Sequence, residues 1–147
     1  FTLSPERKVA LVHGYHYGFA NFRDDHDTIN RYVDGTFLQQ QKQIMQYVLR
    51  GAADVGMMSN IFLQWEIKRK PELRHLLMVS PKIDHEYKLP MMLRSGGPIS
   101  AESLTLIIAK MAKSGTLKSF FDVFGVGDLV IFDPEGDHTV NADTSDR

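Results

Sequence analysis

The sequence predicts an α/β fold: a doubly wound, mostly parallel sheet flanked by helices. Two observations predict it. Short β-rich runs alternate with segments of helical periodicity, which is typical of a parallel sheet with helical crossovers. The chain has 147 residues, of which 43% are hydrophobic, and this is room for one compact domain of ordinary composition.

Two strands are predicted near the start of the chain. Residues 8–12 form an apolar run of the length of a buried strand, and Gly14 follows it. Residues 29–33 are predicted as a second, weaker strand that the turn pair Asp34-Gly35 ends.

A helix is predicted over residues 37–50. Thr36 and Gln39 have the spacing of a capping box, and Gly51 stands where a left-handed C-terminal cap belongs. The apolar stripe of this helix consists of Ile44, Met45, Val48 and Leu49.

A third strand is predicted at residues 55–58, followed by a second helix. Ser59 is placed to cap that helix, and Pro71 stops it. Residues 75–79 and 86–93 are predicted as two further strands, the second of them in part an edge or a connector because it contains a proline.

Two amphipathic helices are predicted in the last third of the chain. Ser100 caps the first and Gly115 ends it, while Thr116 begins the second and Gly125 closes it. Their apolar residues recur at helical spacing: Leu104, Ile107, Ile108 and Met111, then Leu117, Phe120, Phe121 and Phe124. The last ten or so residues are polar, and we expect them to be poorly ordered.

The composition excludes several classes of function. With 17 basic and 18 acidic residues, the chain has no electrostatic footprint for nucleic acid, and the basic run 68–70 is interpreted as the solvated end of a helix. No apolar run approaches the roughly 18 residues of a membrane span. The chain has no cysteine, which excludes disulfides and thiolate chemistry.

The sequence predicts no catalytic residue, metal site or cofactor. His13, His16 and His26 lack a second cluster of ligands, so the spacing is weak evidence for a metal. Ser59 lacks the flanking glycines of a hydrolase nucleophile. The glycines of residues 14–18 stand at the wrong intervals for dinucleotide binding, and the tyrosines between them would obstruct a pyrophosphate.

A binding site is predicted instead where the first and third strands end. Ligands of open α/β sheets bind off the carboxyl ends of strands, so the loops after these strands could converge on a small polar molecule. The predicted site residues are Gly14, Tyr15, His16, Tyr17, Ser59 and Asn60. In the alternative interpretation, Ser59 only caps its helix and the tyrosines only cover the sheet edge.

Four segments, in this order, resemble the bacterial extracellular solute-binding proteins of family 3, the type II periplasmic proteins of amino-acid ABC transporters. Lys8–Gly18 (KVALVHGYHYG) is similar to the strand and glycine loop that open the family's second lobe. Leu49–Met58 (LRGAADVGMM) resembles its step from helix to strand, and Tyr87–Arg94 (YKLPMMLR) its return strand. Lys113–Leu117 (KSGTL) resembles the turn before its closing helix, so the resemblance covers roughly residues 7–125.

The resemblance implies a periplasmic, non-catalytic clamp that binds a small polar, amino-acid-like solute and delivers it to an ABC permease. It implies a ligand-binding lobe at residues 1–94 with a hinge near 86–95, returning helices of the first lobe at 95–127, and a tail at 128–147. Ser59 falls where amino-acid binders carry an aspartate, and a neutral hydroxyl does not offset a buried ammonium charge. This speaks against an α-amino acid as the ligand.

Two other functions stay open on the same fold. One is an extracytoplasmic sensor domain that moves the output module of a receptor, in which case a transmembrane helix should follow the tail. The other, ranked lower, is a dehydratase that acts on a small carboxylic acid with His16 or a nearby acid as proton donor. Because the first lobe is missing, we expect the chain to be part of a longer protein, or to form a homo-oligomer or a domain-swapped dimer.

Overall fold

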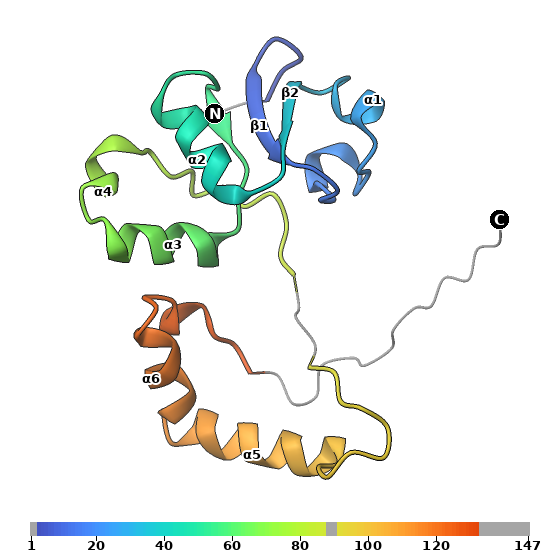
Figure 1. Ribbon diagram of the computed structural model, residues 1–147, viewed down its shortest axis with the longest axis vertical. Coiled ribbons are helices and arrows are strands. Elements are labelled where there is room, and N and C mark those ends of the chain that lie inside the picture. The colour runs from blue at the N-terminus through green and yellow to red at the C-terminus, as the bar shows by residue number, and fades with distance from the viewer. Residues whose placement is uncertain (1–2, 88–90, 133–147) are drawn as a thin grey trace, which may run out of the picture. The chain divides into compact units, whose positions relative to one another are not determined.

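The predicted fold class is confirmed by a computed structural model, which describes residues 3–87 and 91–132 (Figure 1). The chain divides into two units, Phe1–Pro90 and Met91–Arg147. The first unit is α/β, and the described part of the second is helical. The roles predicted for residues 1–94, 95–127 and 128–147 stay predictions. The prediction that the last ten or so residues are poorly ordered concerns residues outside the described ranges.

The first unit is built on a three-stranded parallel sheet with the order β2-β1-β3. The central strand β1 is Lys8–Val12, as predicted, and it pairs along its whole length with β2, Asp34–Leu38. The third strand, β3, is Val55–Gly56, shorter than the predicted 55–58. Because all three strands are parallel, their carboxyl ends lie at the same edge of the sheet.

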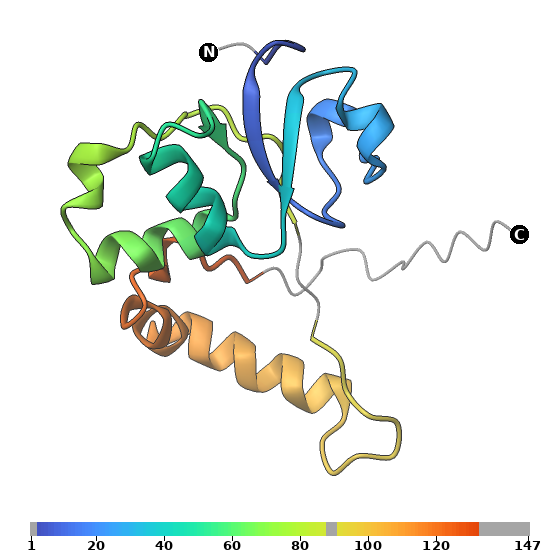
Figure 2. The same ribbon diagram turned by 45° about the horizontal axis from the view of Figure 1, so that its top comes forward.

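Alternate residues of β1 supply the two faces of this unit. Val9 and Leu11 are fully buried in one apolar cluster with Ile29, whereas Ala10 and Val12 belong to a second cluster with Ile44. Both views show the helices that carry these isoleucines, α1 (His26–Ile29) and α2 (Gln41–Leu49), on opposite sides of β1 and β2 (Figures 1 and 2). The near-continuous apolar run of β1 follows from this double coverage.

The predicted strand at residues 29–33 is wrong. Ile29 is the last residue of α1, and the strand begins at Asp34, where a turn was expected. Pairing with β1 overrides the turn preference of Asp34-Gly35. The Gly35 N–H also donates to Asn30 Oδ1 at 3.1 Å, so the glycine allows the Asn30 side chain to lie close to the strand.

Helix α2 begins later than its predicted start at residue 37. Thr36 lies within β2, so the capping box predicted from Thr36 and Gln39 is wrong. Gln40 and Gln43 form the box instead, with the Gln43 side chain accepting the Gln40 N–H at 3.0 Å. Gly51 has a φ of 69°, which confirms the predicted left-handed cap.

The next helix confirms its predicted cap, and the two strands predicted after it are wrong. Helix α3 is Asn60–Arg69, and the Phe62 N–H donates to the Ser59 hydroxyl. His75 lies in a short helix, α4 (Leu73–Leu76), and the described residues between it and residue 93 form no strand. Residues 88–90 of the predicted second strand lie outside the described ranges. Buried residues of α2, α3 and α4 form the third apolar cluster: Met45, Leu63, Ile67 and Leu73.

The second unit confirms both predicted helices. Helix α5 is Ala101–Lys113 with the Ser100 hydroxyl accepting the Ser103 N–H, and α6 is Thr116–Asp122. Gly115 has a φ of 75° between them. A short 3₁₀ helix, η2 (Gly127–Leu129), follows.

Asp25, the N-cap of α1, makes stability depend on pH. Hydrogen bonds from the side chain and backbone of Thr28, together with the Arg23 side chain, lower the pKa of Asp25 to about 2 from 3.8. A carboxyl with a lowered folded-state pKa contributes stability above pH 3.8 that is lost as the pH falls toward 2. We therefore expect the free energy of unfolding of the Asp25→Asn protein to fall less steeply between pH 3.8 and pH 2 than that of the parent chain. An equally steep fall of the free energy of unfolding in the Asp25→Asn protein and in the parent chain would contradict this role of Asp25.

Candidate functional site

The carboxyl edge of the sheet, here called the carboxyl rim, consists of the loops after β1, β2 and β3. The His13 N–H donates to the Leu38 carbonyl at 2.8 Å, which joins the ends of β1 and β2. Gln41 Oε1 accepts both the backbone N–H of Ser59, at 2.7 Å, and its hydroxyl, at 2.9 Å, which joins the start of α2 to the start of α3. The loops of the rim are therefore held in place in pairs by direct hydrogen bonds.

The predicted site residues of the rim are placed differently with respect to solvent. Gly14, Tyr15, His16, Ser59 and Asn60 are exposed, with 41% of Tyr15 accessible. Ser59 uses its hydroxyl twice, accepting from Phe62 and donating to Gln41, so the alternative interpretation of Ser59 as a helix cap holds in the structure. Ligand contacts of the exposed residues stay predictions.

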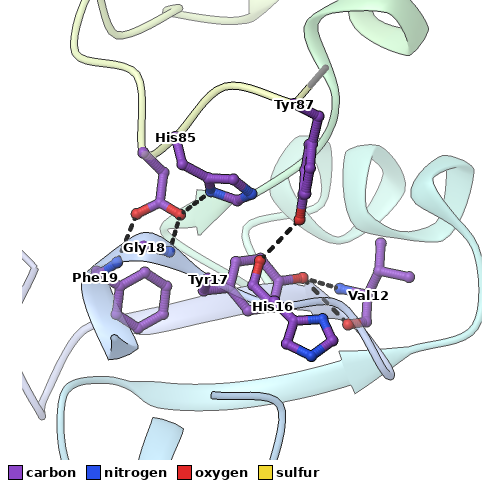
Figure 3. Close-up of polar contacts among 8 residues, drawn as sticks. Val12, His16, Tyr17, Gly18, Phe19, His85 and Tyr87 are labelled. Atoms are coloured by element: carbon purple, nitrogen blue, oxygen red, sulfur yellow. Dashed lines mark hydrogen bonds and ion pairs between the residues drawn. The ribbon is translucent and has the colours of Figure 1, made fainter. Parts of the chain in front are cut away.

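Tyr17 is buried, with only 4% of its surface accessible. Its hydroxyl accepts the Val12 N–H at 2.7 Å and donates to the Val12 carbonyl at 3.1 Å (Figure 3). Burial raises the pKa of this hydroxyl above its usual range. The Tyr17 side chain therefore holds the glycine loop from inside, and its predicted ligand contact stays a prediction.

A segment absent from the sequence-based site lies over the same loop, and we call residues 80–87 the strap. Asp84 accepts the Gly18 N–H at 2.7 Å and the Phe19 N–H at 2.8 Å through its two carboxylate oxygens. The Tyr87 hydroxyl donates to the His16 carbonyl at 3.1 Å (Figure 3). A Cβ on Gly18 would lie 2.6 Å from the Asp84 carbonyl oxygen, so the strap packs against the loop at a distance only glycine allows.

His85 fills the space between the strap and the loop. Its Nδ1 lies 2.8 Å from Asp84 Oδ2, and its buried Nε2 has no hydrogen-bond partner among the described residues. Figure 3 shows the ring directed toward Tyr87, with 4.2 Å between ring centroids and 79° between planes. The Phe22 ring lies 5.5 Å away on the loop. The imidazole is therefore held by a hydrogen bond at one end and by the rings of Tyr87 and Phe22 beside it.

The loop under the strap stores backbone strain. Asn21 and Phe22 both have positive φ values, 54° and 58°, a region that costs a residue with a side chain roughly 1–2 kcal/mol. The Phe22 N–H donates to the Tyr17 carbonyl at 2.9 Å, and the Asn21 N–H to the Gly18 carbonyl at 3.1 Å. Such strain persists where surrounding contacts over-determine the backbone, as the strap and these turns do.

Two hollows of the described residues lie away from the carboxyl rim. One, of about 340 Å³, is lined by residues 93–101 of the second unit, and another, of about 260 Å³, by Ser4, Glu6, Arg7 and Asp54. Within residues 3–87 and 91–132, no three histidines or carboxylates gather as a metal site. No helix of these residues is long and apolar enough to span a membrane. The rim is thus an open surface in the first unit.

Comparison with protein-family models, curated proteins and solved structures finds no match to this chain. No family assignment follows from these comparisons. The sequence motifs and the geometry of the rim are therefore the basis for proposing a function.

Proposed function

We propose that the first unit is the ligand-binding lobe of an extracytoplasmic solute-binding protein, which holds a small polar solute at the carboxyl rim for delivery to an ABC permease. The observation that carries the proposal is the shared edge of three parallel strands whose loops are joined by hydrogen bonds. Small ligands of open α/β sheets bind outside this edge. The family named here rests on the resemblance of the motifs.

The side chains of the rim suit a small polar molecule. Tyr15 and His16 offer exposed rings with hydrogen-bonding tips, and Asn60 offers both an amide donor and an acceptor. Asn60 is also the first residue of the ten-residue helix α3, whose free N–H groups favour acceptor atoms. Asn60 is held in α3 and the His16 carbonyl accepts a hydrogen bond from the Tyr87 hydroxyl, so these two residues have less order to gain on binding.

The open shape of the rim favours a second wall from elsewhere. Small-molecule sites bury roughly 70–90% of a ligand, which a flat rim alone cannot do. A clamp of two lobes meets this requirement, because the ligand is enclosed only when a second surface closes over the rim.

The test is a thermal-shift screen of small polar solutes with the full chain. The single tryptophan, Trp65, lies in α3 and reports unfolding of the first unit. A solute at about 100 times its Kd adds about 2.7 kcal/mol, a shift of several degrees in Tm. We expect Tyr15→Ala and Asn60→Ala each to lose most of the shift.

The matched control is Tyr32→Ala. Tyr32 is 38% exposed, close to the 41% of Tyr15, and it precedes β2 at the amino edge of the sheet. It should keep the full shift. Equal shifts in all three variants, or no shift of the parent chain with any solute, would contradict the proposed site.

A further inference from the structure

Two histidines from different elements meet at the carboxyl rim. His13, directly after β1, and His26, the first residue of α1, place Nδ1 and Nε2 3.0 Å apart. Both side chains are exposed. We propose that this pair is a two-nitrogen binding site for a transition-metal dication such as Ni²⁺ or Zn²⁺, with water or a bound molecule supplying the remaining ligands.

The spacing of the two nitrogens is that of neighbouring ligands on one ion. Metal–imidazole bonds of about 2.0–2.1 Å put two nitrogens roughly 2.9 Å apart at a right angle and roughly 3.3 Å apart in a tetrahedron. The observed 3.0 Å lies between these values, nearer to the right angle of an octahedral or tetragonal ion. Imidazole nitrogen is a preferred ligand of Ni²⁺, Cu²⁺ and Zn²⁺. Small rotations of the rings would aim both lone pairs at one ion in place of the hydrogen bond.

The His26 ring and the His13 backbone are held by contacts outside the pair. The His26 ring stacks on Phe37 of β2, with 3.6 Å between centroids and 10° between planes. The backbone of His13 is fixed by its hydrogen bond to Leu38. A chelating pair that is already assembled binds an ion with less loss of conformational freedom than two free side chains.

The charge around His26 favours a cation. Its neighbours along the chain are Asp24, Asp25 and Asp27, and the first and last of these are exposed. Arg23 offsets one of these charges through its ion pair with Asp25, which leaves a net negative potential beside the imidazole.

The proposed pair of His13 and His26 differs from a site of His13, His16 and His26, for which the sequence spacing is weak evidence. Within the described residues no third histidine or carboxylate joins the pair. His16, three residues after His13, belongs to the solute surface proposed above, and this inference does not depend on that surface.

The first experiment needs no variant. Paramagnetic Ni²⁺ broadens the NMR signals of the rings it binds, so a titration of the full chain identifies the ligands directly. We expect the ring signals of His13 and His26 to broaden together at the lowest Ni²⁺ concentration. Earlier broadening of His75, an exposed histidine of α4, or of any other histidine would overturn the proposal.

The second experiment measures affinity by competition with a chromophoric chelator. His13→Gln and His26→Gln should each weaken Ni²⁺ binding tenfold or more, while the control His75→Gln leaves it unchanged. Circular dichroism of each variant checks that the fold is retained. Unchanged Ni²⁺ affinity in a folded His26→Gln protein would overturn the proposal.

Discussion

Tyr17→Ala should destabilise the first unit more than any substitution at the exposed positions of the rim. Replacing a buried aromatic ring by alanine costs about 3–5 kcal/mol, and a domain of this size is stable by about 5–15 kcal/mol. Tyr17→Phe isolates the hydroxyl. It leaves the buried Val12 N–H without its partner, at a cost of roughly 1–3 kcal/mol, whereas the Val12 carbonyl still accepts the Tyr15 N–H at 3.3 Å.

The measurement is urea unfolding followed by the fluorescence of Trp65. The control is Tyr32→Phe, since the Tyr32 hydroxyl makes only an exposed contact of 3.4 Å with Asn21. That variant should change the free energy of unfolding by less than about 0.5 kcal/mol. Equal stability of Tyr17→Phe and Tyr32→Phe would show that the Val12 hydrogen bonds are not needed.

Gly18→Ala should release the strap from the glycine loop. The added Cβ would meet the Asp84 carbonyl oxygen at 2.6 Å, so the backbone of the strap must move away. The two charge-assisted hydrogen bonds of Asp84 are then lost, and such bonds are worth about 1.5–3 kcal/mol each. We expect amide hydrogen exchange of Gly18 and Phe19 to accelerate by roughly tenfold or more, since tenfold corresponds to about 1.4 kcal/mol.

Two variants separate this effect from general loosening of the loop. Asp84→Ala should accelerate the same two amides without adding any bulk. Gly14→Ala is the matched control, because a Cβ there meets no atom within 4 Å and only the positive φ of 75° is strained. Equal exchange at Gly18 in the Gly14→Ala and Gly18→Ala proteins would argue against a strap held by Asp84.

Local signals predicted the elements that local contacts stabilise. The hydroxyls of the N-caps Ser59 and Ser100 each accept a hydrogen bond from the backbone N–H three residues further along the chain. Gly51 and Gly115 end their segments with positive φ values. These contacts depend on a few neighbouring residues, so a single sequence is enough to predict them.

Elements that depend on distant contacts were missed. β2 carries the turn-like pair Asp34-Gly35 and is a strand only because β1 pairs with it. The carboxylate of Asp84 lies 66 residues from the Gly18 amide that it accepts. The contact of His13 with His26 spans 13 residues and was likewise missed, although both histidines were noted. No period or cap signal encodes such pairings, because they exist only after the sheet has formed.

The exposed positions of the candidate site could be predicted from the sequence, whereas the burial of Tyr17 could not. Parallel strands place the loops after β1 and β3 at one edge, so the exposed positions of Tyr15, Ser59 and Asn60 follow from topology. Tyr17 differs from Tyr15 because its ring turns inward to the apolar cluster of Val9 and Leu11. Which of two neighbouring tyrosines turns inward is decided by packing, which the sequence pattern does not specify.

The position of β1 has a consequence for how the chain folds during synthesis. Of the three strands of this sheet, β1 is the first to leave the ribosome, and it is the central strand of the finished sheet. Its partners lie 26 and 46 residues further on, at the pairs Lys8–Asp34 and Val9–Val55. β1 must therefore remain without one or both of its partner strands until most of the first unit has been synthesised. This delay is when a nascent chain of this topology most needs a chaperone.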